Sequence, residues 1–274
     1  MPPRACCGAA RCALSAATHC RYSDRVALSQ VDCITAITEH SAGFADAVRG
    51  RLDADVEHCP GWTVADLVAH VVDVHWFWAT IVEKRLQEPP AAEERPQRAD
   101  DDDLVAAFEA GARRLVRVLG EVDQRERLWT WAPAQQDAGF VVRHQVQEIA
   151  VHHWDAVNAT GGTMVLAPEI AADAADEFLH VSVSSDDDPA EPVAPALEGT
   201  VVLRCTDTSD EWLVSDGAAP GTVGVERRTP TNQHPAIEAT ASDLLLWLYQ
   251  RVRLDDGNVD PALLTRFRRL TFTD

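Results

Sequence analysis

Four long segments with helical spacing of apolar residues constrain the fold of this chain more than any other feature. They cover residues 32–50, 63–86, 104–120 and 140–159. In the second segment, Leu67, Val71 and Trp78 recur every three or four residues, which places them on one face of a helix. Four amphipathic helices of this length, joined by modest loops, predict a four-helix bundle.

Local signals mark the ends of these helices. Thr63 and Asp66 are spaced as in a capping box, in which each residue satisfies a free backbone N–H of the first turn. Gly50 suits the position just after the first helix, and Gly120 is expected to stop the third.

Beyond these segments the periodicity of the sequence changes. A shorter helix is predicted at 168–182, and the acidic, proline-rich residues 184–198 predict a linker. The pattern then alternates as in strands, followed by two short helices; these elements cover 200–207, 211–216, 222–228, 242–252 and 260–267. The predicted fold class is thus α + (α+β), with a bundle at 31–183 and a small α+β domain at 199–274.

The first 30 residues predict a disordered tail. Their longest apolar stretch is too short for the core of a signal peptide, and whether the native protein contains them is left open. Five of the seven cysteines lie before residue 34 without regular spacing, which is a poor disulfide framework. We therefore expect reduced thiols in the cytoplasm.

The net charge of −20 argues against two classes of partner. Phosphate backbones and anionic membrane surfaces repel a strongly acidic protein, so nucleic acid is not expected as a partner. No apolar run reaches the eighteen or so residues of a membrane span. A protein without membrane contacts, monomeric or homodimeric, is expected.

Residues 148–156, EIAVHHWDA, set polar side chains among apolar ones. Glu148 and His152 are four residues apart and Asp155 is three beyond, so all three share one helical face. Burying a carboxylate or an imidazole in a bundle interior costs several kcal/mol of desolvation free energy unless the group is paired or binds metal. The best third ligand is His70, on the inward stripe of residues 63–86, whereas His75 is predicted to be peripheral.

Two imidazoles and one carboxylate with an open fourth position are typical of a catalytic zinc site. Asp155 would then accept a hydrogen bond from a ligand histidine and fix its tautomer. Trp154, next to this face, would line the pocket wall. The alternative interpretation is a buried Glu–His ion pair beside a core histidine.

Four ordered stretches carry a resemblance to a known family. They are CPGWTVADLVAHV (59–71), GFVVRHQVQEIAVHHWDA (139–156), AADAADEFL (171–179) and SDLLLWLYQR (242–251). Together they resemble the mycothiol-dependent maleylpyruvate isomerases of actinobacteria over roughly residues 32–270. The resemblance implies a DinB-like four-helix bundle and a C-terminal domain similar to sterol carrier proteins.

The resemblance also implies a chemistry. In the family, the positions of His70, Glu148 and His152 bind a divalent metal, usually zinc, and mycothiol is the thiol cosubstrate. Its thiolate adds to the cis double bond of maleylpyruvate; rotation and elimination then give fumarylpyruvate. We therefore expect a zinc-dependent, mycothiol-using isomerase or S-transferase for a small electrophile, whose identity the sequence does not specify.

Two arginines are candidates to bind the carboxylates of an anionic substrate. Arg251, in the C-terminal domain, is the first, and Arg143 is the second. Many relatives have a second arginine where this chain has His144, which is either a spare ligand or a surface residue.

Two other functions stay open at this point. In a metal-dependent hydrolase, Asp155 or His153 would act as the base for a metal-activated water. In a non-catalytic binding protein the metal would be structural, which usually requires a fourth protein ligand, with His144 or Cys59 as candidates.

Overall fold

The chain folds into helices and one small sheet. A computed structural model describes residues 28–183, 196–218, 222–231, 234–255 and 259–271. Its internal contacts divide it into two compact units, one formed by Val26–Ala174 and one containing Ala175–Asp274.

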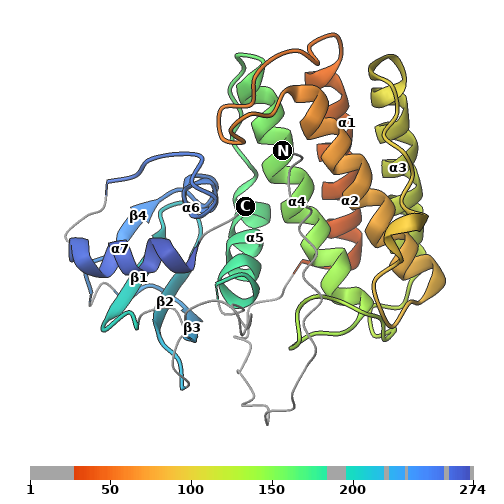
Figure 1. The fold of residues 1–274 in the computed structure, drawn as a ribbon. Coiled ribbons are helices and arrows are strands. Elements are labelled where there is room, and N and C mark those ends of the chain that lie inside the picture. The colour runs from red at the N-terminus through yellow and green to blue at the C-terminus, as the bar shows by residue number, and fades with distance from the viewer. Residues whose placement is uncertain (1–27, 184–195, 219–221, 232–233, 256–258, 272–274) are drawn as a thin grey trace. The chain divides into compact units, whose positions relative to one another are not determined.

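The first unit is a four-helix bundle (Figure 1). Its helices are α1 (Gln30–Val48), α2 (Val64–Lys84), α3 (Asp101–Glu121) and α4 (Ala138–Ala159), with a short 3-10 turn, η1 (Ala92–Glu94), between α2 and α3. α1 packs on α3 and α4, and α2 packs on the same two helices. The four predicted helices are thus present, each within three residues of its expected ends.

The helix ends follow local chemistry. Capping boxes begin α1 at Ser29 and Asp32 and α2 at Thr63 and Asp66, the second as predicted. Gly50 follows α1 with φ of 72°, a conformation that glycine adopts without strain. The stop expected at Gly120 is wrong, because α3 continues through Glu121.

α2 is the most apolar of the long helices. By length and composition it could cross a membrane, with a mean hydropathy of 1.2 over eighteen residues, although polar residues interrupt it. More than half of that window is buried inside the protein, and Leu67, Val71 and Trp78 belong to the bundle core. Packing on α3 and α4 accounts for its hydropathy.

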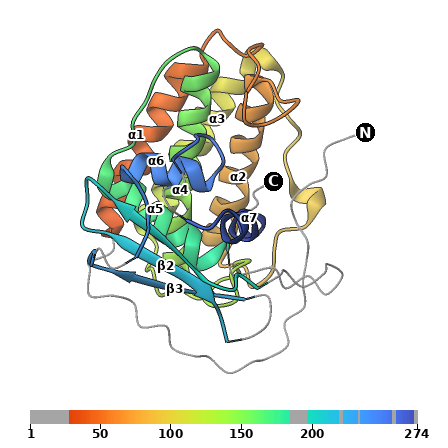
Figure 2. The same ribbon diagram turned by 90° about the vertical axis from the view of Figure 1, so that its left-hand side faces the viewer.

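The second unit contains a four-stranded sheet with the order β3-β2-β1-β4. Its elements are β1 (Thr200–Cys205), β2 (Glu211–Asp216), β3 (Val223–Arg228), β4 (Ile237–Ala239), α6 (Ala241–Leu248) and α7 (Pro261–Leu270). β2 pairs antiparallel with β1 and β3, and Figure 2 shows β2 and β3 as neighbouring arrows. β4, which the sequence did not reveal, pairs parallel with β1.

α5 (Pro168–Val181) spans the division between the two units, which falls after Ala174. The sequence places its boundary later, in the linker 184–198, of which residues 184–195 lie outside the described part. Residues 1–27 of the predicted tail lie outside it as well. The domain limits at 183 and 199 therefore stay predictions, whereas the predicted fold class is confirmed.

Candidate metal site

His70 on α2 lies beside Glu148 and His152 on α4. One nitrogen of each imidazole and one carboxylate oxygen all lie within 4.8 Å of one another. His70 Nε2 is 3.2 Å from Glu148 Oε1, and His152 Nε2 is 3.4 Å from the same oxygen. The three residues that the sequence singled out thus form one cluster, and two nitrogens with one oxygen are a donor set that suits zinc. That the cluster binds metal stays a prediction.

Asp155 supports this cluster from one turn further along α4. His152 Nδ1 donates a hydrogen bond to Asp155 Oδ2 at 3.1 Å. The side chain of Asp155 is fully buried, so the bond is protected from water. It fixes the tautomer in which His152 Nε2, the nitrogen that faces Glu148, has a free lone pair when the ring is neutral.

Glu148 and His152 perturb each other's titration. Burial alone would lower the pKa of His152, but hydrogen bonds to Asp155 and Glu148 outweigh it and raise that pKa to about 9. Burial alone would raise the pKa of Glu148, but hydrogen bonds to His152 and His70 hold it well below its usual value. Without metal, the proton on His152 is stabilised at the position that a cation would take.

The cluster is reached from solvent on the side of α2. The side chain of His70 is 36% exposed, against 19% for Glu148 and 13% for His152. The Trp62 ring covers part of His70, with centroids 5.2 Å apart. Trp154, predicted to line the pocket, has its ring 5.7 Å from His58 in the α1–α2 connection, and its role stays a prediction.

The other histidines of α4 have different partners. His153 packs on α1, where its Nδ1 lies 3.1 Å from His40 Nδ1. His144 stacks on Phe140, with ring centroids 5.1 Å apart, and its Nδ1 accepts a hydrogen bond from Gln147. Neither belongs to the cluster that could hold a metal ion in the described part of the chain.

Sequence reasoning missed two buried polar residues near this cluster. His75, predicted to be peripheral, is 0% exposed, and Gln145 is 1% exposed. His75 lies on the same face of α2 as Val71, Trp78 and Val82, because these four residues follow one another at intervals of four, three and four. This apolar periodicity was the signal in the sequence that could have predicted its burial.

The bundle also matches a known family. The family described as mycothiol maleylpyruvate isomerase N-terminal domain matches residues 34–157, which include His70, Glu148 and His152. The match covers the bundle and relates this part of the chain to that family.

A solved structure, the crystal structure of the mycothiol-dependent maleylpyruvate isomerase, resembles most of the chain. The TM-score is 0.55 at 13% sequence identity, over 82% of this chain and 90% of that one. At this identity the likeness establishes the fold. No curated protein matches the chain.

Arg143, the second of the two candidate arginines, lies in the bundle unit and is held by a carboxylate. Arg143 donates from Nε and Nη2 to the two carboxylate oxygens of Asp173, at 2.9 and 3.0 Å. Nη2 also donates to the Asp173 carbonyl oxygen. These hydrogen bonds join α4 to the first half of α5. They favour a structural role for Arg143 over the binding of substrate.

Arg251 lies in the second unit, just beyond α6, which ends at Leu248 rather than at 252 as predicted. Gln250 has φ of 60°, and the backbone turns back so that Arg251 N–H donates to Leu246 O. Its guanidinium donates to Tyr249 O and lies 5.9 Å from the Tyr249 ring. Its predicted role in binding substrate stays a prediction.

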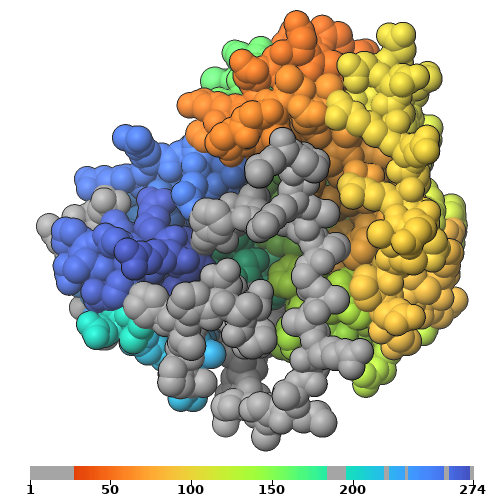
Figure 3. All heavy atoms as spheres, in the orientation of Figure 1, coloured from red at the N-terminus to blue at the C-terminus, as the bar shows by residue number. Residues whose placement is uncertain are grey.

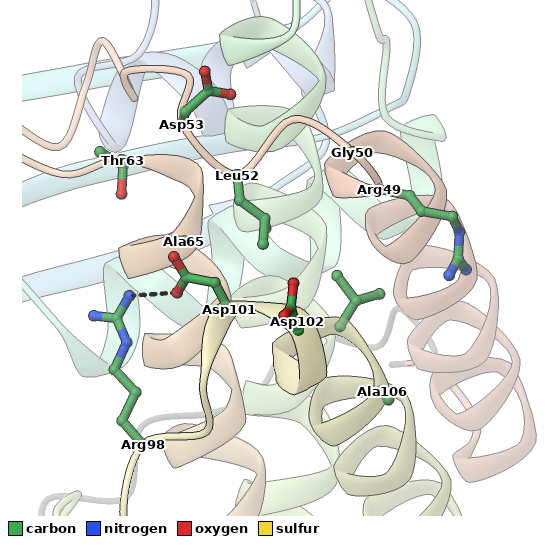
Figure 4. A pocket seen from close by; sticks show the side chains of 11 residues that line it. Arg49, Gly50, Leu52, Asp53, Thr63, Ala65, Arg98, Asp101, Asp102 and Ala106 are labelled. Atoms are coloured by element: carbon green, nitrogen blue, oxygen red, sulfur yellow. Dashed lines mark ion pairs between the residues drawn. The ribbon is translucent and has the colours of Figure 1, made fainter.

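A separate hollow of about 750 Å³ lies in the bundle unit, between the α1–α2 connection and the first turns of α3 (Figure 4). Orange residues of the connection meet yellow residues of α3 there on the surface (Figure 3). Its lining includes none of the predicted site residues. Arg98 pairs with Asp66 and Asp101, and Arg49 pairs with Glu109, so both arginines of the hollow are neutralised.

Proposed function

We propose that this chain is a divalent-metal-dependent, mycothiol-using isomerase or S-transferase for a small electrophilic substrate, with zinc as the metal. The observation that carries the proposal is the approach of His70, Glu148 and His152 to within 4.8 Å of one another, inside a domain of the mycothiol maleylpyruvate isomerase family. Three protein ligands leave a coordination position for an exogenous ligand.

The chain's own residues prepare this site for a thiol. A divalent metal held there would supply a Lewis acid that lowers the pKa of a thiol to below neutral pH. Asp155 holds the ring of His152 in place, and the exposed edge of His70 marks the direction of access. Arg251 is our candidate to bind a carboxylate of the substrate, with Arg143 second because Asp173 already occupies its guanidinium.

The two alternatives receive less support from the site. Both bases considered for a hydrolase are engaged, Asp155 with His152 and His153 with His40. For a structural metal, a fourth protein ligand is expected, and in the described part of the chain the cluster contains three.

We also propose that the protein works in the cytoplasm, as a monomer or homodimer without nucleic acid or membrane partners. Its three described cysteines, Cys33, Cys59 and Cys205, are not in disulfide bonds, which suits a reducing compartment. The net charge of −20 disfavours anionic polymers and surfaces.

Cobalt substitution tests the thiol chemistry. We expect mycothiol, added to the cobalt-loaded protein, to give a thiolate-to-cobalt charge-transfer band that saturates at one thiol per chain. The His152→Ala variant should give no band, whereas His234→Ala, which removes an exposed histidine of the second unit, should behave as wild type. A cobalt-loaded protein without the band would contradict the use of mycothiol.

A further inference from the structure

Two side chains in the bundle interior lack hydrogen-bond partners. Both ring nitrogens of His75 and both amide atoms of Gln145 are buried and make no hydrogen bond within the described part of the chain. Each buried polar atom left in this state costs about 1–3 kcal/mol. Four such atoms need an explanation, and an internal ligand or water that satisfies them is one.

The pairing of α2 with α4 brings these two residues to the same level of the bundle. His70 on α2 faces Glu148 and His152 on α4. About two turns further along α2, the Trp78 ring centroid lies 5.9 Å from that of His144. The helices therefore run antiparallel, and this register puts His75 and Gln145 at a similar level along the bundle. Gln145 precedes Glu148 by three residues, so it lies one turn from the proposed ligand on the same inward face.

His75 is also within electrostatic reach of the cluster. Burial lowers the pKa of His75 to about 4, and among charged groups the Glu148 carboxylate acts on it most strongly, followed by His152 and His70. The Phe108 ring centroid lies 5.4 Å from that of His75. A neutral imidazole has one donor and one acceptor, and so does the amide of Gln145, which suits a bridging water.

Glu148 has an atom to complete the bridge. Its Oε1 faces both His70 and His152, whereas Oε2 makes no hydrogen bond to the described residues. We propose that His75 and Gln145 hold an internal water molecule that donates a hydrogen bond to Glu148 and thereby orients this carboxylate toward the two histidines. His75 is then a positioning residue for the metal site, an inference that rests on the proposed metal binding.

The test compares zinc affinity in three proteins, measured by competition with a chelator. His75→Phe keeps an aromatic ring against Phe108 but removes both nitrogens, and we expect it to weaken zinc binding about 10- to 100-fold, as for other groups that orient metal ligands. His75→Gln keeps a donor and an acceptor and should stay within about 3-fold of wild type. The unfolding midpoint of metal-free His75→Phe should be unchanged or raised, because a buried polar group is removed.

The outcomes separate this inference from the proposed function. A wild-type protein that binds no zinc contradicts the metal site itself. If wild type binds zinc and His75→Phe binds it equally tightly, the positioning role is wrong. Should His75→Phe fail to fold, Gln145→Leu takes its place with the same expected loss. A high-resolution crystal structure with no water within hydrogen-bond distance of His75 and Gln145 would also overturn the proposal.

Discussion

Two inward-facing histidines show how strongly surroundings decide the behaviour of one residue type. His152 has carboxylates at both ring nitrogens, and its pKa is raised to about 9. His75 is fully buried and has no hydrogen-bond partner in the described part of the chain, and burial lowers its pKa to about 4. The first is prepared to hold a positive charge, whereas the second stays neutral over the physiological range.

This difference predicts a pH dependence for the metal-free protein. The folded pKa of His75, about 4, lies below its unfolded value of 6.5, so between these pH values the unfolded chain binds the extra proton. The free energy of unfolding therefore decreases as the pH falls from 6.5 toward 4. This one group lowers it by about 1.4 kcal/mol per pH unit in that range. Chemical denaturation between pH 7 and 5 measures the slope, which should be shallower in His75→Phe; equal slopes in both proteins would refute the assignment.

Asp155 carries a second prediction at this scale. Asp155→Asn keeps the size of the side chain but removes the charge that orients His152, so zinc affinity should fall about 10- to 100-fold. Asp46→Asn, at an exposed carboxylate on α1, is the matched control and should bind zinc as wild type does. Titration against a chelator measures both, and an unchanged affinity in Asp155→Asn would show that the hydrogen bond to His152 is dispensable.

The cluster was predictable because its members obey helical spacing. Glu148 and His152 are four residues apart, and His70 lies on the inward stripe of its own helix. Gln145 was not predictable, because its significance depends on the absence of a partner across the α2–α4 interface. Arg143 was the second candidate to bind substrate, because a guanidinium can bind a carboxylate through two hydrogen bonds. Its pairing with Asp173 depends on the fold and was not predictable.

At the scale of elements, the long helices were predictable because their signals are local. Apolar periodicity and the capping box at Thr63 and Asp66 lie within single segments. β4 escaped notice because it has three residues and forms by parallel pairing with β1, more than thirty residues earlier. Its position depends on a partner that no local pattern specifies.

Close packing of α1 on α4 gives a prediction for a glycine. A Cβ at Gly43 would lie 2.2 Å from His153 Cε1, so Gly43→Ala should destabilise the protein by about 1–3 kcal/mol. Gly120→Ala, in α3 with nothing within 4 Å, should leave stability unchanged or raise it by up to about 1 kcal/mol. Denaturation midpoints compare the two; equal stability would mean that His153 does not pack against α1 as described.

For the whole molecule, the change of hydrophobic period near residue 199 correctly predicted a helical bundle followed by a small α+β unit. The division after Ala174 could not be predicted, because α5 continues through it as one regular helix. The net charge of −20 makes a local cationic site necessary for any anionic substrate. A metal held by the bundle cluster would provide it.

Zinc content tests the central claim most directly. Purified wild-type protein, saturated with zinc and freed of excess, should retain one zinc per chain by elemental analysis. His152→Ala should retain almost none, because two remaining ligands bind weakly, while His234→Ala should retain one. Equal zinc in wild type and His152→Ala, or none in wild type, would contradict the account.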